Sequence, residues 1–264
     1  MNEDYILYKN VKITYYTYGN PKGKTIVWLH GFLENSQMWT YLTDHLPTTF
    51  RHIFIDLPGF GKSQCIAYVH TMEEMAKVVK AVMTKLKVRK AALIGHSMGG
   101  YVSLAFGELY PESVRAICLL HSTASADSED KIQNRNRGIE IAKKNPQLFA
   151  RTTFQGLFAQ WAHELYKTQI EEQSEIAAET AVQGIVAALE GMKIRPDRTV
   201  LLHFAPFPVF HIVGLEDPVF VGQSLDDQLK APKVKAHILK AGHMSHIENR
   251  EELIPVLNAF FKSL

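Results

Sequence analysis

The sequence predicts an α/β chain with a mostly parallel sheet, an antiparallel hairpin at its N-terminus and a helical insertion late in the chain. Short apolar runs typical of buried strands alternate with segments whose apolar residues recur at helical spacing. The apolar run 91–94 leads through Gly95-His96-Ser97-Met98-Gly99 into a helical segment. Strand patterns then vanish from about 124 to 199 and return before the C-terminus.

The length and composition fit one globular domain. At 264 residues, a second independent domain would be hard to fit. We therefore expect a single domain over 1–264, with a core at 1–123 and 200–264 and a helical insertion at about 124–199, called the lid from here on. The hydrophobic content of 46% and charged content of 21% are ordinary for such a domain.

Net charge and the absence of long apolar runs also limit which binding partners and locations are expected. A formal net charge of +2 gives no case for nucleic acid or an anionic membrane as a partner. The sequence has no apolar run of the ~20 residues needed to span a bilayer, and residues 1–8 do not resemble a secretory signal. We expect a cytoplasmic monomer or homodimer that acts on a small molecule. Cys65 and Cys118 lack metal-ligand spacing, so they are expected to stay reduced.

The strands follow from apolar runs that are too short for helices. Lys9-Asn10 separates the first two strands into a hairpin, and the turn cluster 19–23 ends it. Strands are predicted at 5–8, 11–18, 25–29, 52–55, 91–94, 114–120, 208–213 and 234–239.

The helices follow from apolar residues at helical spacing and from their stop signals. Pro47 and Pro111 end two of them, and Gly191 is expected to cap a third. Helices are predicted at 37–46, 72–86, 101–109, 128–144, 146–161, 175–189 and 251–261.

Ser97 lies at the turn between a strand and a helix. A serine there adopts a strained backbone so that its hydroxyl projects above the sheet, and residues two positions away must be nearly free of side chain. Gly95 and Gly99 meet that demand. The following helix points its N-terminal N–H groups at the same place, which suits a developing oxyanion.

A second motif is the loop Asp56-x-x-Gly59-x-Gly61-x-Ser63. Its end echoes a phosphate-binding loop, but position 56 is Asp where that motif requires glycine, so nucleotide binding is disfavoured. With the stretch 95–100 and His30-Gly31-Phe32, this loop resembles the α/β-hydrolase family. The resemblance implies a doubly wound sheet and a lid over the active site.

The resemblance also implies a catalytic triad of Ser97, Asp217 and His243. His243 occupies the family's Gly-His position, with the acidic residue Glu248 a few positions on, and Asp217 ends the family's Gly-x-x-Asp motif. The order serine, acid, histidine agrees with this fold. The alternatives are His246 for the base, and Glu216, Asp127 or Asp130 for the acid.

An acyl-transfer site also needs donors for a negative oxygen. By resemblance, these are the backbone N–H groups of Met98 and Phe32. We expect Gly31 to let the backbone approach the substrate and His30 to brace the loop through hydrogen bonds.

Serine at position 97 narrows the reaction, because relatives that hydrolyse epoxides or carbon–halogen bonds carry aspartate there. The default is hydrolysis of a carboxylic ester or thioester of small to medium acyl size, with no metal and no organic cofactor. The alternatives are a carbon–carbon bond hydrolase, a lyase similar to the one in menaquinone biosynthesis, a perhydrolase, and a small-molecule receptor with slow turnover.

The lid supplies the candidate substrate-binding residues. Its aromatic side chains are spaced for one helix face that packs the lid onto the body, lines an acyl pocket, or does both. Arg135 is the candidate for binding a substrate carboxylate, ahead of Arg137 and Arg151, and Trp39 is expected near the His-Gly loop. The apolar candidates are Phe149, Phe154, Leu157, Phe158 and Trp161.

Overall fold

An eight-stranded sheet forms the centre of the computed structural model, which describes residues 1–264. The strand order is β1-β2-β4-β3-β5-β6-β7-β8, antiparallel for β1, β2 and β4 and parallel across the rest. This confirms the predicted fold class. The strands are β1 (Asn2–Tyr8), β2 (Val11–Gly19), β3 (Thr25–Leu29), β4 (Arg51–Ile55), β5 (Ala91–His96), β6 (Val114–Leu120), β7 (Val209–Gly214) and β8 (Val234–Leu239).

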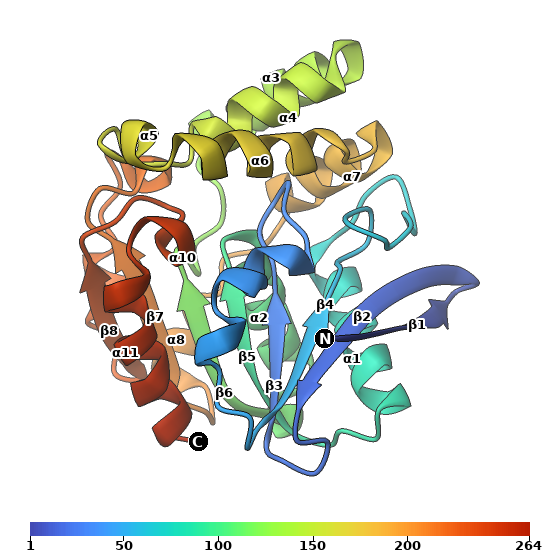
Figure 1. Cartoon of the computed structure of the whole chain (residues 1–264), viewed down its shortest axis with the longest axis vertical. Coiled ribbons are helices and arrows are strands. Elements are labelled where there is room, and N and C mark those ends of the chain that lie inside the picture. The colour runs from blue at the N-terminus through green and yellow to red at the C-terminus, as the bar shows by residue number, and fades with distance from the viewer.

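Helices cover both faces of the sheet, which explains why its central strands are apolar on both sides. In β3, Val27 and Leu29 pack into the core beneath α1 (Met72–Lys85) and α2 (Met98–Leu109). Trp28 packs into the opposite core with α11 (Arg250–Lys262), visible on the other side of the sheet in Figure 1. The remaining short helices are α8 (Leu201–Phe204), α9 (Asp226–Leu229) and α10 (Ser245–Glu248).

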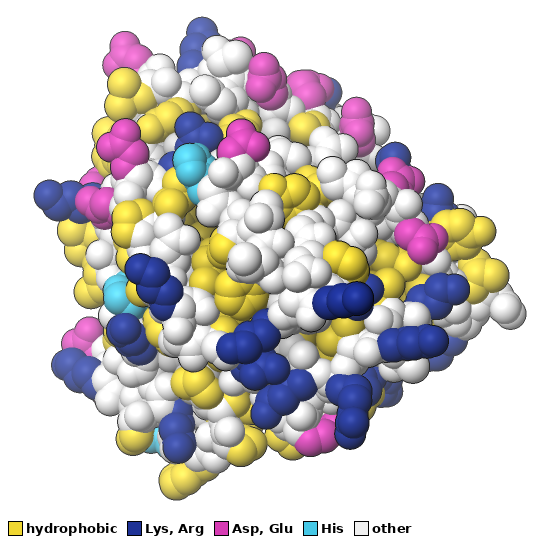
Figure 2. Space-filling model, turned by 60° about the horizontal axis from the view of Figure 1, so that its bottom comes forward, with side chains coloured by type: hydrophobic (Ala, Val, Ile, Leu, Met, Phe, Trp, Pro, Cys, Tyr) yellow, Lys and Arg dark blue, Asp and Glu magenta, His cyan; other side chains and the backbone are white.

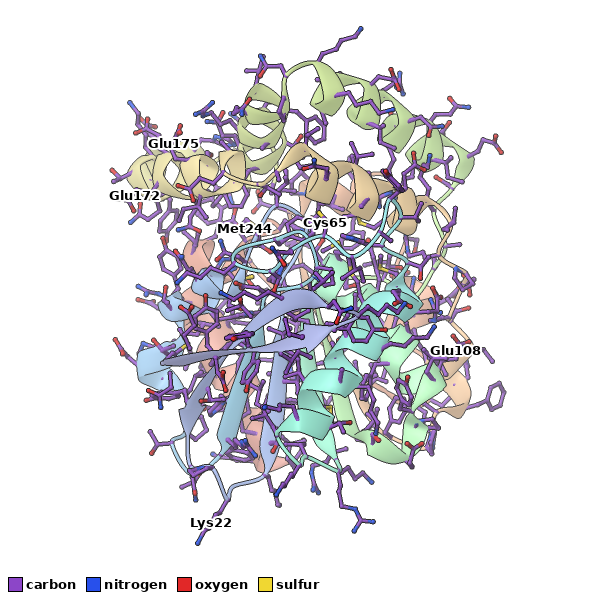
Figure 3. All side chains as sticks on the ribbon, turned by 90° about the vertical axis from the view of Figure 1, so that its right-hand side faces the viewer. Lys22, Cys65, Glu108, Glu172, Glu175 and Met244 are labelled. Atoms are coloured by element: carbon purple, nitrogen blue, oxygen red, sulfur yellow. The ribbon has the colours of Figure 1, made fainter.

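Five helices lie within the segment expected to form the lid. They stack above the carboxyl ends of the central strands, at the top of Figure 1. Figure 3 shows Met244 and Cys65 beneath them, and Glu172 and Glu175 on α6. The helices are α3 (Glu129–Lys144), α4 (Pro146–Gln155), α5 (Ala162–Leu165), α6 (Lys167–Ala178) and α7 (Val182–Lys193). None of the chain's helices has the length and apolar character needed to cross a membrane.

Three predicted helices were wrong in extent. The segment 175–189 is split between α6 and α7, because Ala181 is extended (ψ 141°) although apolar spacing continues across it. Gly191 is inside α7 and caps nothing; a Cβ there would lie 1.8 Å from the His70 carbonyl oxygen, so the glycine allows close packing.

Helix α4 ends at Gln155 with Gly156 as its cap, well before residue 161. The segment 37–46 forms two short 3₁₀ turns, Ser36–Tyr41 and Thr43–His45.

Basic side chains gather at the end of the molecule opposite the lid. That end comes forward in Figure 2, where many lysine and arginine side chains lie close together. Lys22 marks the same end in Figure 3. This positive charge is therefore remote from the carboxyl ends of the parallel strands, where ligands usually bind in such sheets.

Candidate active site

Ser97 lies on the turn between β5 and α2 with a backbone that L-residues rarely adopt, φ 48° and ψ −113°. The two glycines around it are needed for packing. A Cβ on Gly95 would lie 2.3 Å from the Gly99 carbonyl oxygen, and one on Gly99 would lie 2.2 Å from the Leu29 carbonyl oxygen. The structure therefore bears out the steric argument for the 95–99 motif. Strain of this kind collects at functional sites.

His243 and Asp217 meet across the carboxyl ends of β7 and β8. His243 Nδ1 lies 2.8 Å from Asp217 Oδ2, and Asp217 Oδ1 accepts from the Val219 N–H at 2.9 Å. Burial alone would raise the pKa of Asp217, but His243 and His121 hold that pKa well below its usual value. Asp217 is therefore an ionised acceptor, which fixes the Nδ1–H tautomer of His243 and leaves Nε2 free to act as a base.

The other acid candidates are placed elsewhere. Glu216 is exposed. Asp127 is buried against two arginines, Arg135 and Arg195. The rival base, His246, is buried with neither ring nitrogen hydrogen-bonded, and burial lowers its pKa to about 3. The structure thus brings the three residues of the predicted triad to one end of the sheet, and none of the rival acids, including the exposed Asp130, bonds to His243.

His121 is a second imidazole on the same carboxylate, which sequence reasoning missed. Its Nδ1 lies 3.1 Å from Asp217 Oδ2, and its Nε2 lies 2.7 Å from Ser245 Oγ. Burial lowers the pKa of His121 to about 4, so the ring is neutral, donates to Asp217 and accepts from Ser245. Its position directly after β6, at the edge where the parallel strands end, was the available signal.

The two predicted oxyanion donors have no competing partner. Neither the Phe32 N–H nor the Met98 N–H donates to another protein atom. His30 accepts from the Leu57 N–H at 2.9 Å and contacts the Gly31 carbonyl at 2.8 Å, which is the bracing role expected of it.

The structure gives a reason for glycine at position 31 that the sequence did not predict. The Gly31 N–H donates to Glu34 Oε2 at 2.7 Å, and a Cβ on Gly31 would lie 2.3 Å from that oxygen. Gly31 therefore makes room for a carboxylate of its own loop, and the expected approach of its backbone to substrate stays a prediction.

A cavity of about 200 Å³ opens beside Ser97 and His243. Ser97 Oγ makes no hydrogen bond within the protein, so it is free to face this space. Among the predicted substrate-binding residues, Arg135 lines the cavity, as do Phe149 and Leu157 from the lid. The other lining residues are Phe32, Glu34, His96, Tyr101, Thr153, Leu189, Met192 and Val219.

Four predicted substrate-binding residues do not line the cavity. Trp39 is fully buried and packs on Trp28, with ring centroids 4.9 Å apart. Phe154 and Phe158 pack on each other inside the core, and Trp161 is at the surface, 36% exposed. The lid aromatic side chains share helical spacing in the sequence. Helix α4 ends before Phe158 and Trp161, so these side chains do not form one helix face.

A cationic cluster adjoins the cavity. The buried Asp127 carboxylate is paired with both Arg135 and Arg195, and the Arg195 guanidinium lies 4.0 Å from the Tyr101 ring centroid. Lys131 lies 5.6 Å from the Phe220 ring centroid and makes no ion pair, and burial lowers its pKa to about 8. Two arginines thus share the Asp127 carboxylate, and Lys131 lies near enough for the charge of Asp127 to oppose the lowering of its pKa.

Glu248 joins the lid to the loop that carries His243. Its carboxylate accepts from the Ala159 N–H of the lid at 2.7 Å and from the Met244 N–H at 3.1 Å. The His243 N–H in turn donates to the Leu157 carbonyl at 3.1 Å. The lid and the base loop are therefore held together by backbone groups on both sides.

Two buried clusters have the residue types of a metal site: Glu34 with His96 and His246, and His121 with Asp217 and His243. In the second cluster both histidines already donate to the carboxylate. In the first, His96 lies 2.6 Å from Glu34. The second cluster is therefore a hydrogen-bond network, whereas in the first cluster Glu34 Oε1 and both His246 ring nitrogens have no hydrogen-bond partner.

Comparison with known proteins agrees with this geometry. A family model described as alpha/beta hydrolase fold matches residues 24–250. The uncharacterized hydrolase YugF of Bacillus subtilis is 35% identical over 114 residues, which are 43% of this chain and 42% of that protein. A 2-succinyl-6-hydroxy-2,4-cyclohexadiene-1-carboxylate synthase of Citrobacter koseri is 25% identical over 88% of this chain and 91% of its own.

Among solved structures, a thermophilic esterase from Thermogutta terrifontis, studied with malate bound, superposes with a TM-score of 0.90 and 27% identity. The superposition covers 100% of this chain and 99% of that esterase. The family model spans most of the sequence and includes the motif around Ser97. This chain belongs to the alpha/beta hydrolase fold family and is a hydrolase.

Proposed function

We propose that this hydrolase cleaves a carboxylic ester or thioester of small to medium acyl size through Ser97, His243 and Asp217. One observation carries the proposal: His243, bonded to Asp217 at 2.8 Å, and the unbonded Ser97 hydroxyl border the same cavity. A serine hydroxyl needs such a base to become a nucleophile.

In the proposed reaction, His243 takes the proton of Ser97 as the hydroxyl attacks the acyl carbon. The buried Asp217 carboxylate stabilises the imidazolium that forms. The oxyanion accepts hydrogen bonds from the Met98 and Phe32 N–H groups, which have no other acceptor. His243 then protonates the leaving group, and later activates the water that releases the acyl group from Ser97.

The cavity favours a short acyl group. Its volume of about 200 Å³ is below the range of ~300–1,000 Å³ usual for ligand pockets. Most of its apolar lining comes from the lid segment, with Phe149, Leu157, Leu189 and Met192, and the rest comes from Phe32, Tyr101 and Val219.

A second candidate is a carboxylate-bearing substrate, cleaved at an ester, at a carbon–carbon bond, or in a lyase step. Arg135 lines the cavity, and Asp127 neutralises only part of the charge of the cationic cluster. Two of the similar proteins support it, since one is named for a carboxylate product and the other was studied with malate bound. The cytoplasmic location and the monomer or homodimer state stay predictions from the sequence.

The first test is turnover of p-nitrophenyl esters from acetate to decanoate by the wild type and by Ser97→Ala. We expect sustained turnover that is fastest for short chains, and a loss of at least about 1,000-fold in the variant. If the folded wild type reacts with a fluorophosphonate probe at Ser97 but turns over no ester, ester hydrolysis is wrong and the carbon–carbon hydrolase, lyase and receptor alternatives move ahead.

The second test compares the monomethyl ester of succinic acid with a neutral ester of the same length. We expect Arg135→Met to raise KM for the charged ester about ten-fold and to leave KM for the neutral ester unchanged. Arg137, which is exposed and bonds only Asn134, supplies the matched control Arg137→Met. Equal effects on the two esters would contradict a carboxylate subsite at Arg135.

A further inference from the structure

His96, the residue before Ser97, is buried between two groups that only accept hydrogen bonds. Its Nδ1 lies 2.6 Å from Glu34 Oε2, and its Nε2 lies 2.9 Å from the His243 carbonyl oxygen. A carboxylate and a carbonyl offer no hydrogen, so both ring nitrogens must carry one. The ring with hydrogen on both nitrogens is an imidazolium cation.

Glu34 is arranged as the anion of this pair. Its Oε2 accepts from the Gly31 N–H at 2.7 Å as well as from His96, and its side chain is 3% exposed. Burial alone would raise the pKa of Glu34, but the charge of His96 and its hydrogen bond are the largest of the effects that lower this pKa to about 2. Burial opposes the charge on His96, yet Glu34 and the His243 carbonyl together hold the pKa of His96 above its usual value.

These contacts join three loops of the site. The Gly31 N–H belongs to the loop that also supplies the Phe32 N–H, His96 precedes the nucleophile, and the His243 carbonyl belongs to the proposed base. We propose that His96 is a positioning residue, a buried imidazolium paired with Glu34, which fixes the oxyanion loop and the base loop against Ser97. The inference rests on the proposed function for its catalytic consequence, though not for the charge state of the ring.

The other titratable groups around His96 leave Glu34 as its direct ion-pair partner. Burial lowers the pKa of His30, of His121 to about 4 and of His246 to about 3, so these rings are neutral. Asp217 is ionised but bonded to His121 and His243. The groups that face His96 are His30 and Glu34 from the loop after β3, His121 after β6, Asp217 after β7, and His243 and His246 after β8.

Loss of the proton from His96 has a specific consequence. A neutral ring would turn one lone pair toward either the carboxylate or the carbonyl, and that contact would become repulsive. The loops would then separate, so kcat should fall at alkaline pH while KM changes little. Only glycine at position 31 leaves room for this ring, because a Cβ there would lie 2.7 Å from His96 Nδ1.

The direct test is nitrogen NMR of the whole protein labelled at its 12 histidines. At about pH 8.5, where solvent-exposed histidines are neutral, we expect one ring that still carries hydrogen on both nitrogens, and its signal should be missing from His96→Gln. Should that variant fail to fold, the doubly protonated ring in the wild type still decides the matter. Finding every ring neutral at that pH would overturn the proposal.

The kinetic test uses the pH dependence of kcat for p-nitrophenyl acetate. In Glu34→Gln, which keeps an acceptor for the Gly31 N–H, we expect kcat to fall at least ten-fold and its alkaline limb to move down by at least one pH unit, with KM changed less than three-fold. The limb should be absent in His96→Gln, and His237→Gln, altered on the half-buried edge strand β8, should keep the wild-type profile.

The two tests separate the two proposals. An alkaline limb at the same pH in wild type, Glu34→Gln and His96→Gln would overturn the positioning role of His96. Absence of any ester turnover in the wild type would overturn the proposed function, and the NMR result would still decide whether His96 is the buried cation.

Discussion

His121 and His243 contact the same oxygen atom: their Nδ1 atoms lie 3.1 Å and 2.8 Å from Oδ2 of Asp217. Because the carboxylate only accepts, both rings donate to it. The Ser245 hydroxyl, 2.7 Å from His121 Nε2, completes the arrangement. Asp217 is therefore held on one oxygen by two imidazoles and on the other by the Val219 N–H.

This arrangement predicts that two variants at position 121 differ in kcat. His121→Leu removes one donor from Asp217 and should lower kcat about ten-fold, since a hydrogen bond to a charged group contributes roughly 1.5–3 kcal/mol. His121→Gln can still donate to Asp217 and accept from Ser245, so it should retain most of the activity. His121 has φ 49°, and both replacements keep a Cβ there, so backbone strain affects them equally. Equal kcat values for the two folded variants would contradict this role.

The packing of α7 on the loop before α1 predicts that two glycine-to-alanine variants differ in the stability of the folded protein. Gly191→Ala would place a Cβ 1.8 Å from the His70 carbonyl oxygen and should destabilise the fold by about 1–3 kcal/mol. Gly156→Ala is the control, because its nearest neighbours would be 3.5 Å away and its backbone is helical. Urea unfolding of both variants measures the difference, and similar midpoints would show that the α7 contact is not rigid.

Burial raises the pKa of Glu248 to about 7, although backbone N–H groups from Ala159, Met244 and Gly242 oppose that shift. Between the usual carboxyl value and pH 7, the folded chain keeps a proton that the unfolded chain has lost. The free energy of unfolding from this group therefore falls as the pH rises through that interval, by up to about 3 kcal/mol. Above about pH 7 this contribution is gone.

Urea unfolding of wild type and Glu248→Gln at about pH 5 and pH 8 measures this effect. The wild type should lose more stability than the variant over that interval, because glutamine does not titrate. Parallel losses in the two proteins would show that Glu248 is ionised throughout.

The cavity lining predicts which lid residue controls acyl length. Leu157→Ala enlarges the cavity and should shift the preferred p-nitrophenyl ester toward longer chains. Phe154 is buried but outside the cavity, so Phe154→Ala should cost about 3–5 kcal/mol of stability without changing the order of preference. The ester series and thermal unfolding, run on both variants, distinguish the two outcomes. A changed chain-length order in Phe154→Ala would contradict the assigned lining.

The sheet was predictable because each strand carries its own signal. The runs 25–29 and 114–120 match β3 and β6 in full, since a strand buried on both faces is apolar along most of its length. The run 234–239 matches β8 in full as well, although β8 is an edge strand with most of its residues exposed or half-buried. The turn at Ser97 was also predictable, because sterics restrict the residues two positions away. The helices of the lid were less predictable, since the extended backbone at Ala181 interrupts the predicted helix although the apolar spacing continues across it.

The surroundings of the proposed triad could not be derived from local pattern. His96 and Glu34 are 62 residues apart, and His121 and Asp217 are 96 apart, so only the folded sheet edge brings each pair together. Trp39 and Trp161 show the converse problem. Trp39 follows the His30-Gly31-Phe32 motif closely and Trp161 continues the helical spacing of the lid aromatics, yet Trp39 is enclosed in the core and Trp161 is at the surface.

The central claim is that Ser97 forms an acyl-enzyme. Rapid acid quench of the protein mixed with p-nitrophenyl acetate, followed by mass spectrometry of its peptides, tests this directly. We predict an added acetyl group on the peptide that contains Ser97, appearing within the first turnover and absent from Ser97→Ala. Sustained ester hydrolysis with no acyl group on Ser97, and with equal activity in Ser97→Ala, would contradict the account.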